Sequence, residues 1–576
     1  MSEGPVLPSV MSATLTARSD ATRDPRPSIL PTPPSDSEKN FYLGPQWRWV
    51  TPVSFLGYLL IVVSIALFVA QHWWSALLLL PLLISSVGTF VSLFTSSRPR
   101  RDSLKGHQEK VRRWSPAVLP TVDVFLPSAG EDLEVLRNTY RHVSGLRWGA
   151  RLQVYVLDDS ARTEVEELAV EHGFTYLTRP DRGHFKKAGN LRFGFSHSDG
   201  DYILVLDADF VPRQDALFEL TPYFDEPDVA IVQSPQYFDV SKDMNWLQRA
   251  AGATQILFYR WVQPSRDRSS AAICVGTSAM YRRRALDESG GFALIGHSED
   301  VHTGFNLMKV GYRVRYVPTI VTKGLCPDQL DQFLTQQYRW CTGSMSLLFS
   351  TAFHRTKLTF AQRACFWSGF LYYITTAVNV FVMAIPALLM AWFDPAGVAP
   401  ANYVFVLLAM MTRQTIIPFI TLQSESMMSL TRVQMTYSFS HAVALFDVLR
   451  HRTDAWVATG TKARSRTATR VTRLIRVWCV GVQVLLWAAI FSHVGTYGFA
   501  RWSLLIAFTL LNLYLVYPLI RGSATIPVLS DVGSRLSRLL PQRRQDRWAA
   551  VDRELGQMDR APRVDAADNL REGNTR

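Results

Sequence analysis

Two aspartates, Asp207 and Asp209, have the residue type and the spacing to hold a hard divalent cation. They directly follow Tyr202–Leu206, an apolar run rich in β-branched residues that predicts a strand buried on both faces. In open α/β sheets ligands lie beyond the carboxyl ends of the strands, and Mg²⁺ prefers oxygen ligands. An isolated Asp-x-Asp is also common in solvated turns, so its neighbours in the sequence must decide between a metal site and a turn.

Further polar clusters occur in the same part of the chain. In order they are Ser128–Asp132, Asp158–Asp159, Lys186–Asn190, His297–Asp300 and Gln336–Trp340. Each has an ordinary structural explanation: Asp158 could cap a helix, Lys187 could be a solvated charge, and Asp300 could begin a helix. Arg339 and Trp340 could form a cation–π pair. Taken together and in this order, the clusters favour a functional site.

Short apolar runs alternate with stretches of mixed polarity between residues 115 and 345. Strands are predicted at Val122–Leu126, Gln153–Leu157 and Tyr202–Leu206, and helices at 131–143, 162–172 and 187–197. Alternating strands and helices imply a mostly parallel sheet, so residues 115–345 are expected to form an α/β domain of ordinary size. Several of the polar clusters lie where these strands end.

Long apolar runs predict membrane spans on both sides of this domain. Residues 51–97 contain no Asp, Glu, Lys or Arg, and this length suffices for two helices of about 20 residues, as a bilayer core requires. Later spans are expected at 364–393, 402–423, 477–500 and 502–520, although Arg413 lies within the second of these. Residues 429–450 are expected to form an interfacial helix. The membrane part is thus predicted to comprise residues 50–97 with two spans, residues 355–450 with interfacial helices and two spans, and residues 475–521 with two spans.

Composition and charge are typical of a membrane enzyme. The 576 residues are 48% hydrophobic and carry a formal net charge of +13. Basic residues gather beside the apolar runs, as in Arg98–Arg113, which favours a membrane surface over nucleic acid and predicts that this end is cytoplasmic. The catalytic domain and both termini are therefore expected in the cytoplasm. The five cysteines have neither metal-ligand spacing nor a disulfide pattern.

Three segments are expected to lie outside these packed elements. Residues 1–45 are rich in Pro, Ser and Thr and predict a disordered tail. Residues 451–470 predict a cytoplasmic loop. Residues 522–576 are highly charged and predict a tail that is mobile or bound to the surface.

In their succession, the clusters resemble the motifs of the processive, membrane-integrated glycosyltransferases of family 2, which include cellulose, hyaluronan and chitin synthases. That family is recognised by Asp-Asp, Asp-x-Asp, (Thr/Ser)-Glu-Asp and Gln-x-x-Arg-Trp. The matching residues are Asp158-Asp159, Asp207-Ala208-Asp209, Ser298-Glu299-Asp300 and Gln336-Gln337-Tyr338-Arg339-Trp340. The resemblance extends over residues 50–520. It implies an α/β cytoplasmic domain of the GT-A type, inserted between transmembrane helices.

The resemblance implies a nucleotide sugar as the donor, with UDP-glucose favoured. Asp207 and Asp209 would hold Mg²⁺ or Mn²⁺ at the diphosphate, where a cation offsets the charge of the leaving group. The other residues assigned to the donor are Asp158 and Asp159 at the uridine, Lys187 and Arg339 at the phosphates, and Ser128 and Glu131 in the first loop. Ala129 stands where the family often has an aromatic residue near the uracil, so base stacking there is in question.

On the acceptor side, the resemblance makes Asp300, next to Glu299, the general base. Its carboxylate would draw the proton from the acceptor hydroxyl as that oxygen attacks the anomeric carbon. Gln336 and Trp340 would bind the growing glycan chain, and the indole would offer a flat apolar platform to the terminal sugar. The implied reaction is a single inverting displacement that turns an α-linked donor into a β-linked product.

A second resemblance lies in the loop that precedes the fifth expected span. Trp456–Lys462 resembles the cellulose synthase gating loop, Phe-x-Val-Thr-x-Lys, and assigns substrate contacts to Trp456, Thr459 and Lys462. Trp replaces Phe and the Thr-to-Lys spacing is longer, so a plain basic loop is the alternative. The residues after 522 are too few for the β-barrel that binds a cyclic dinucleotide in bacterial cellulose synthases, and no such regulation is expected.

Several functions stay open on the sequence alone. The favoured one is a polymerase that extends a β-glucan and exports it through its own spans, in contact with membrane lipid and with accessory export proteins as further candidate partners. A hyaluronan- or chitin-type synthase using UDP-N-acetylglucosamine is the second. A non-processive transferase to a lipid or glycan is the third, and Gln336–Trp340 argues against it because that motif accompanies processivity. A transporter with a degenerate domain would be expected to have lost some of the acidic residues.

Overall fold

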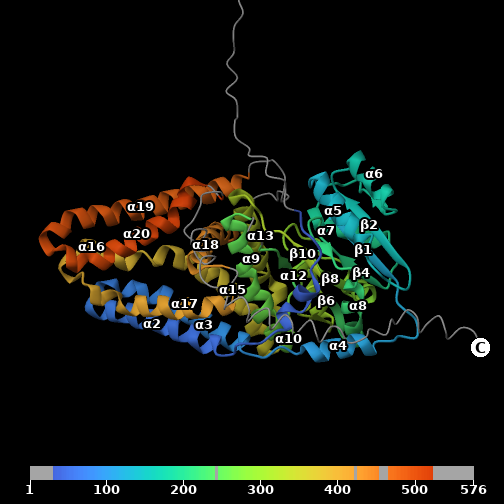
Figure 1. Cartoon of the computed structure of the whole chain (residues 1–576), viewed down its shortest axis with the longest axis horizontal. Coiled ribbons are helices and arrows are strands. Elements are labelled where there is room, and N and C mark those ends of the chain that lie inside the picture. The colour runs from blue at the N-terminus through green and yellow to red at the C-terminus, as the bar shows by residue number, and fades with distance from the viewer. Residues whose placement is uncertain (1–29, 241–243, 421–424, 453–464, 523, 525–576) are drawn as a thin grey trace, which may run out of the picture.

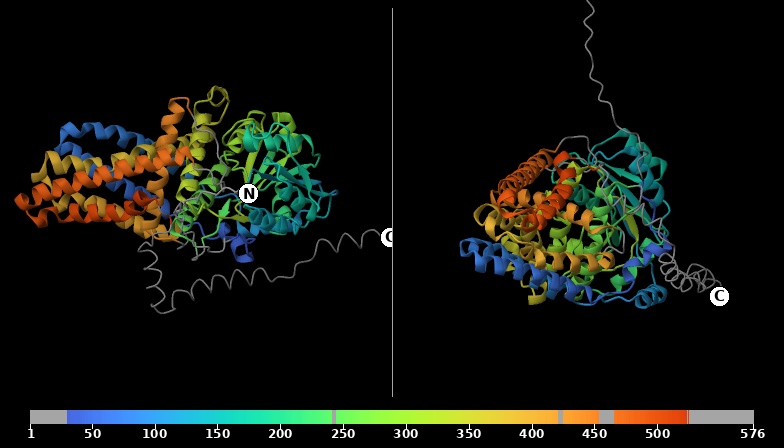
Figure 2. Two further views of the ribbon diagram at one scale, coloured as in Figure 1. Left: turned by 90° about the horizontal axis from the view of Figure 1, so that it is seen from above. Right: turned by 60° about the vertical axis from the view of Figure 1, so that its left-hand side comes forward.

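A computed structural model describes residues 30–240, 244–420, 425–452, 465–522 and 524. An α/β domain and a helical bundle lie end to end along the long axis of the molecule (Figures 1 and 2). The domain is built mainly from the chain between α4 (Leu104–Arg113) and α13 (Leu330–Leu348). The bundle is built from the segments that precede and follow it.

The domain contains a seven-stranded mixed sheet in the order β3-β2-β1-β4-β8-β6-β9. The strands are β1 (Val122–Ser128), β2 (Leu152–Asp158), β3 (Thr175–Leu177), β4 (Tyr202–Val205), β6 (Val229–Gln233), β8 (Ala279–Arg282) and β9 (Arg313–Tyr316). Only β8 runs antiparallel to its neighbours. The predicted α/β class and mostly parallel sheet are therefore confirmed.

A second, three-stranded sheet consists of β5 (Val211–Pro212), β10 (Thr322–Gly324) and β7 (Tyr237–Phe238). β10 pairs antiparallel with β5 and parallel with β7. Because β5 begins two residues after Asp209, this small sheet fixes the chain directly beyond the Asp-x-Asp motif.

Helices cover both faces of the main sheet. α5 (Leu133–Val143), α6 (Thr163–Glu171) and α7 (Lys186–Ser196) agree within about two residues with the helices predicted at 131–143, 162–172 and 187–197. One core gathers Leu126, Leu136 and Val156 with other buried side chains, and a second core on the opposite face gathers Phe125, Leu157 and Leu191. This alternation of side chains is what a strand buried on both faces produces.

Further helices complete the domain and join it to the bundle. They are α8 (Ala216–Leu220), α9 (Trp246–Leu257), the π-helical turn η4 (Phe258–Val262), α10 (Gln263–Arg268), α11 (Arg283–Ser289), α12 (Glu299–Lys309), α13 and α14 (Thr351–Arg355). α13 packs against α15 (Phe360–Val382), α18 (Met427–Leu449) and α19 (Arg466–Tyr497). The helix that carries the Gln-x-x-Arg-Trp motif is thus in direct contact with the bundle.

The bundle contains five helical segments long and apolar enough to cross a membrane, by length and composition, among the described residues. They are Val50–Gln71 (α2), Trp73–Ser96 (η2 and α3, Leu79–Ser96), Phe360–Phe393 (α15 and α16, Ile385–Phe393), Arg466–Tyr497 (α19) and Phe499–Arg521 (α20). Many of their large apolar side chains are exposed, among them Leu83, Phe90 and Phe491. The chain is therefore a multi-pass membrane protein.

The sequence-based count of six spans differs from these five. The expected span 402–423 corresponds to α17 (Val404–Ile420), and residues 421–424 lie outside the described part. The described part of α17 has 17 residues and stops where those residues begin, so this sixth span stays a prediction. It packs along α2, and its Arg413 donates a hydrogen bond to Gln434 of α18. The expected helix at 429–450 is α18, and its position relative to a membrane stays a prediction.

The boundary of the predicted N-terminal tail is wrong for residues 30–45. These residues are ordered, form α1 (Asp36–Lys39), and lie against the α/β domain. The Lys39 ammonium pairs with Asp215 at 2.8 Å and with Glu219, and Tyr42 is buried. Composition alone misses this because the segment is anchored by ion pairs and one aromatic ring, not by a periodic apolar face.

Candidate active site

The Asp-x-Asp motif lies at the end of β4, in the middle of the main sheet. β4 pairs with β1 on one side and with β8 on the other, so the chain beyond Val205 emerges between two strands. The backbone N–H of Asp207 donates to Thr277 Oγ1 at 2.9 Å, and the N–H of Phe210 donates to the Asp207 carbonyl at 3.0 Å. Asp207 and Asp209 are half-buried. The motif is thus a turn at the carboxyl end of a central strand, which is where a ligand site of an α/β sheet is expected.

Lys187 connects this turn to two other loops. It lies in the first turn of α7, and its ammonium group donates to the Asp207 carboxylate and, over 2.8 Å, to the Gly276 carbonyl. The Glu299 carboxylate lies 3.8 Å from the same nitrogen. Burial lowers the pKa of Lys187, but Asp207 and Glu299 outweigh it and hold the pKa above its usual value. Lys187 is therefore a fixed positive charge in the site.

Asp209 lies where negative charge is concentrated. Burial, helped by the charges of Asp207 and Glu131, raises the pKa of Asp209 to about 7. Burial also raises the pKa of Glu131, whose Oε2 accepts a hydrogen bond from the Ala129 N–H at 2.6 Å. A divalent cation would compensate this charge, so the carboxylates fit the expected Mg²⁺ or Mn²⁺.

The carboxylates would not enclose such an ion by themselves. Across the described ranges, no group of three or more His, Cys, Asp and Glu side chains is arranged to hold a metal ion. Mg²⁺ is commonly bound by one or two carboxylates together with substrate phosphates. Asp207 and Asp209 fit that arrangement, in which the diphosphate would supply the remaining ligands.

The loop that carries Asp300 is held in place by two glycines that lie close to it, Gly276 and Gly343. The Oδ2 of Asp300 faces Gly276, where a Cβ atom would lie 3.0 Å away and where φ is +81°. Ser298, at the start of α12, has a left-handed φ of 54°, and its side chain fills the space that a Cβ on Gly343 of α13 would need. Glycine is required at both positions because a side chain would displace the acidic loop.

The environment of Asp300 suits a base that titrates near neutral pH. Burial, followed by the charge of Glu299, raises the pKa of Asp300 to about 7, while Lys187 acts in the opposite direction. Its Oδ1 accepts a hydrogen bond from the Val301 N–H at 2.8 Å. Oδ1 is thus engaged at the helix start, and Oδ2 is the oxygen that faces the Gly276 loop.

The Gln-x-x-Arg-Trp motif lies in α13 beside these carboxylates. Burial lowers the pKa of Arg339, and the charges of Glu299, Asp207 and Asp209 oppose this effect. Arg339 therefore faces the same acidic cluster as Lys187. Gln336 and Trp340 are half-buried on the same helix. The structure brings together the residues predicted for the metal, the phosphates and the base.

Asp158 and Asp159 serve as anchors for neighbouring loops. Asp158 is fully buried at the end of β2 and accepts hydrogen bonds at both oxygens. Its donors are the Ser128 hydroxyl at 3.2 Å, the Ser160 N–H at 3.0 Å and hydroxyl at 2.5 Å, the Arg162 N–H at 2.9 Å and the Tyr176 hydroxyl at 3.1 Å. Asp159 binds Arg179 through two parallel bonds of 2.6 and 2.8 Å.

Arg179 is a site residue that the sequence motifs do not reveal. Its side chain is 1% exposed, and it also donates to the carbonyls of His184 at 2.6 Å and Lys186 at 3.1 Å. It therefore joins the Asp159 loop to the segment that begins α7 and carries Lys187. An isolated arginine carries no spacing signal, and only its partners in space identify it. Trp456, Thr459 and Lys462 of the predicted gating-like loop lie outside the described residues.

Comparisons with known proteins give relatives for about half of the chain. Residues 202–417 match the family described as glycosyl transferase family group 2. Cellulose synthase 1 of Komagataeibacter xylinus is 32% identical over 280 residues, which cover 47% of this chain and 18% of that protein. The UDP-forming cellulose synthase catalytic subunit of Komagataeibacter sucrofermentans is 30% identical over 321 residues, or 54% of this chain and 42% of that protein.

A structural comparison gives a weaker likeness. A mannosyltransferase from Pyrobaculum calidifontis, solved with GDP-Man and Mn²⁺, aligns with a TM-score of 0.45 and 16% identity over 69% of this chain and 99% of that one. The sequence matches to the cellulose synthases, by contrast, span less than half the length of those proteins.

The matched segment runs from β4 through the acidic loop and α13 into α17. Through this segment, the chain is similar to the family 2 glycosyltransferases. Within that family it is related to the bacterial cellulose synthases, at about 30% identity over about half of its length.

Proposed function

We propose that this protein is an inverting, processive glycosyltransferase of the GT-A type that polymerises a β-linked polysaccharide, most favourably a β-glucan from UDP-glucose. The observation that carries this proposal is the convergence of Asp207, Lys187, Asp300 and Arg339 on one site. These groups can bind a diphosphate leaving group and accept a proton from a hydroxyl, which are the two requirements of glycosyl transfer from a nucleotide sugar.

The donor would lie with its diphosphate between the acidic turn and two cations. Asp207 and Asp209 would hold Mg²⁺ or Mn²⁺, which when bound supplies positive charge to the departing diphosphate. Lys187 and Arg339 would bind the phosphate oxygens from α7 and α13. The loops held by Asp158 and Asp159, with Ser128 and Glu131, would line the nucleoside end.

The acceptor hydroxyl would approach from the side of Asp300. The carboxylate of Asp300 would take the hydroxyl proton as the oxygen attacks the anomeric carbon, and the nucleoside diphosphate would leave from the opposite face. Glu299 contributes a neighbouring charge that helps to keep the pKa of Asp300 near 7. This single displacement gives a β-linked product from an α-linked donor.

Contact between α13 and the bundle supports processivity and export. Trp340 would stack on the terminal sugar, and Gln336 would bind the same chain one helical turn away. Since α13 packs on α15, α18 and α19, the growing glycan would pass from the acceptor site directly into the bundle. Positive charge around Arg98–Arg113 supports a cytoplasmic α/β domain.

The UDP-glucose preference rests on the relation to proteins named UDP-forming cellulose synthases. The decisive test is incubation of the purified, lipid-reconstituted full chain with radiolabelled UDP-glucose or UDP-N-acetylglucosamine, followed by sizing of the product. We expect a polymer from UDP-glucose that a β-1,4-glucan hydrolase digests. A product sensitive only to chitinase would exclude the glucan, a single-sugar adduct would exclude processivity, and no transfer from either donor would contradict synthase activity.

A further inference from the structure

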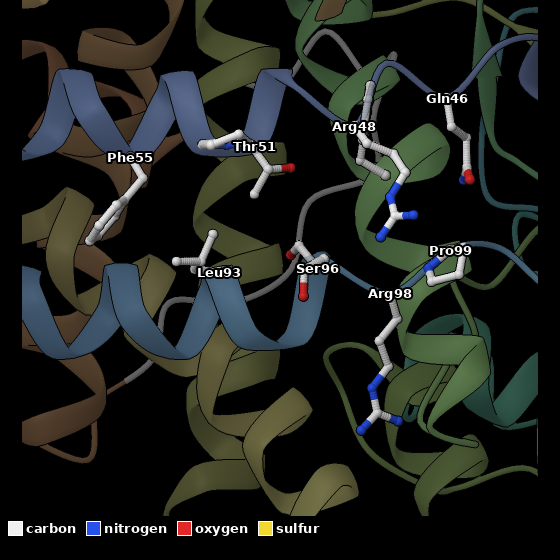
Figure 3. A pocket seen from close by; sticks show the side chains of 11 residues that line it. Gln46, Arg48, Thr51, Phe55, Leu93, Ser96, Arg98 and Pro99 are labelled. Carbon is white, nitrogen blue, oxygen red and sulfur yellow. The ribbon is translucent and has the colours of Figure 1, made fainter.

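A cavity of about 340 Å³ lies at the base of the bundle, far along the chain from the acidic site. It is formed where α2 begins and α3 ends, and Trp261 of η4 contributes to its wall. Figure 3 shows the two helices side by side, with Phe55 and Leu93 toward the bundle and Arg48 and Arg98 toward the opposite end. Its volume is within the range of small-molecule sites in proteins.

The outer end of this cavity is basic and hydroxyl-rich. Arg48 is exposed, and Figure 3 shows its side chain directed toward the end of α3, where Ser96 lies; Thr51 lies between the helices. Among the described residues no ion pair involves Arg48 or Arg98, and the Arg98 guanidinium donates only to the Ser269 hydroxyl there. A phosphate group placed here would meet uncompensated positive charge and hydroxyl donors.

The end of α3 is held rigidly. The Arg98 N–H donates to Ser265 Oγ at 3.2 Å, Ser265 Oγ donates to the Thr95 carbonyl at 2.5 Å, and the Arg98 guanidinium donates to Ser269 Oγ at 3.1 Å. These bonds tie α3 to α10 of the α/β domain. The cavity is therefore pre-formed at the junction of the domain and the bundle.

The inner end of the cavity is apolar and continues onto membrane-facing surface. The Phe55 ring lies 5.4 Å from the Phe90 ring, centroid to centroid. Beyond it, Leu59, Phe90 and Phe94 expose between 38% and 54% of their surface on α2 and α3. The basic end of the cavity suits a charged headgroup, and its apolar end suits an acyl chain. A phospholipid at the membrane interface has both parts.

We propose that this cavity binds one phospholipid with an anionic headgroup, with its phosphate at Arg48 and the start of its acyl chains along Phe55 and Leu93. Arg98, whose side chain is directed away from α2 in Figure 3, adds long-range attraction for the same charge. The bound lipid would brace the contact between α2, α3 and α10. The site is separate from the proposed transferase site, so each can fail without the other.

Native mass spectrometry of the purified full chain in detergent tests this directly. Phosphatidylglycerol, phosphatidylcholine and glycerol 3-phosphate are added separately. We expect retention of one phosphatidylglycerol, at least tenfold more than phosphatidylcholine, and no retention of glycerol 3-phosphate because it lacks acyl chains. The R48Q/R98Q variant should lose at least tenfold of this retention. R141Q/R147Q, which removes two exposed arginines of the α/β domain, is matched in charge and should retain the lipid.

A second variant separates a built site from general attraction to basic protein. Thr51→Phe keeps the net charge and fills the cavity, so it should also lose the tightly bound lipid while it keeps its thermal unfolding midpoint without added lipid. Equal retention by the parent, R48Q/R98Q and Thr51→Phe would overturn the proposal. Equal loss in R48Q/R98Q and R141Q/R147Q would also overturn it, because net charge alone would then account for binding.

Discussion

The Tyr338 hydroxyl donates a hydrogen bond to Asp447 Oδ2 over 2.9 Å, between the Gln-x-x-Arg-Trp helix and α18. Asp447 in turn accepts two bonds from Arg470 of α19, at 2.6 and 2.8 Å. Tyr338 precedes Arg339 directly, so this chain of contacts joins Arg339 of the proposed site to two helices of the bundle. Tyr338 and Asp447 are buried, and the Arg470 side chain is 42% exposed. The position of α13 is therefore set partly by the bundle.

Removing the Tyr338 hydroxyl should shorten the product more than it slows the first transfer. Tyr338→Phe keeps the ring but leaves α13 less firmly fixed, and loss of one such bond costs about 1–2 kcal/mol. We expect a fewfold lower mean product length at nearly unchanged donor KM, measured by gel filtration of labelled glycan. Tyr312→Phe is the control, since it also removes a 2.9 Å hydroxyl–carboxylate bond, to Glu288, on the exposed surface. Equal product lengths in both variants would contradict a positioning role.

Asp207→Asn should reduce transfer by more than a hundredfold without loss of expression or membrane insertion. The amide keeps the shape of the side chain but removes the charge that a cation and Lys187 both require. Activity is measured against Mn²⁺ and Mg²⁺ concentration, and chelation of the parent enzyme should abolish its activity reversibly. Asp199→Asn, at a 75% exposed side chain, is the control. Residual activity of Asp207→Asn above a few percent would show that the motif is only a turn.

Asp300→Asn should block transfer and leave donor binding intact. The variant cannot accept a proton, whereas the phosphate-binding groups Lys187 and Arg339 are unchanged. Donor affinity is measured by isothermal titration calorimetry and turnover by release of UDP. Joint loss of binding and turnover would instead indicate that Asp300 supports the fold at the start of α12.

The pH dependence of kcat/KM should report the titration of Asp300. With its pKa raised to about 7, the group is protonated below that pH and cannot act as a base, so the rate should fall tenfold per pH unit on the acid side. Glu299 raises this pKa, so Glu299→Gln should move the acid limb to lower pH. A limb that stays in place in Glu299→Gln would contradict the assignment.

Much of the site could be predicted because it follows strand ends. β1, β2 and β4 are short apolar runs, and parallel strands bring their carboxyl ends to one edge. The motifs after them, Asp158, Asp207 and their neighbours, were therefore recognisable together. The positions of Asp300 and Arg339 in the site came from the resemblance, since their helices lie far along the chain.

The features that the sequence did not reveal depend on single contacts in space. Arg179 has no motif around it, and the left-handed Ser298 is explained only by its contact with Gly343. For residues 30–45, a composition rich in Pro, Ser and Thr predicts a tail, because the ion pairs of Lys39 and the burial of Tyr42 leave no signal in composition.

Arg179→Lys tests whether the clamp on Asp159 serves donor binding. Lysine cannot form the two parallel bonds that the guanidinium makes with Asp159, so the segment before Lys187 should lose its fixed position. We expect the donor KM to rise about tenfold, with kcat changed less, because the base at Asp300 is untouched. Arg137→Lys is the matched control, since that arginine pairs with Glu171 at 3.4 Å with its side chain 55% exposed, and such surface pairs contribute about 0–1 kcal/mol. A parallel loss of kcat, KM and thermal stability in Arg179→Lys would assign the clamp to folding of the domain rather than to the donor.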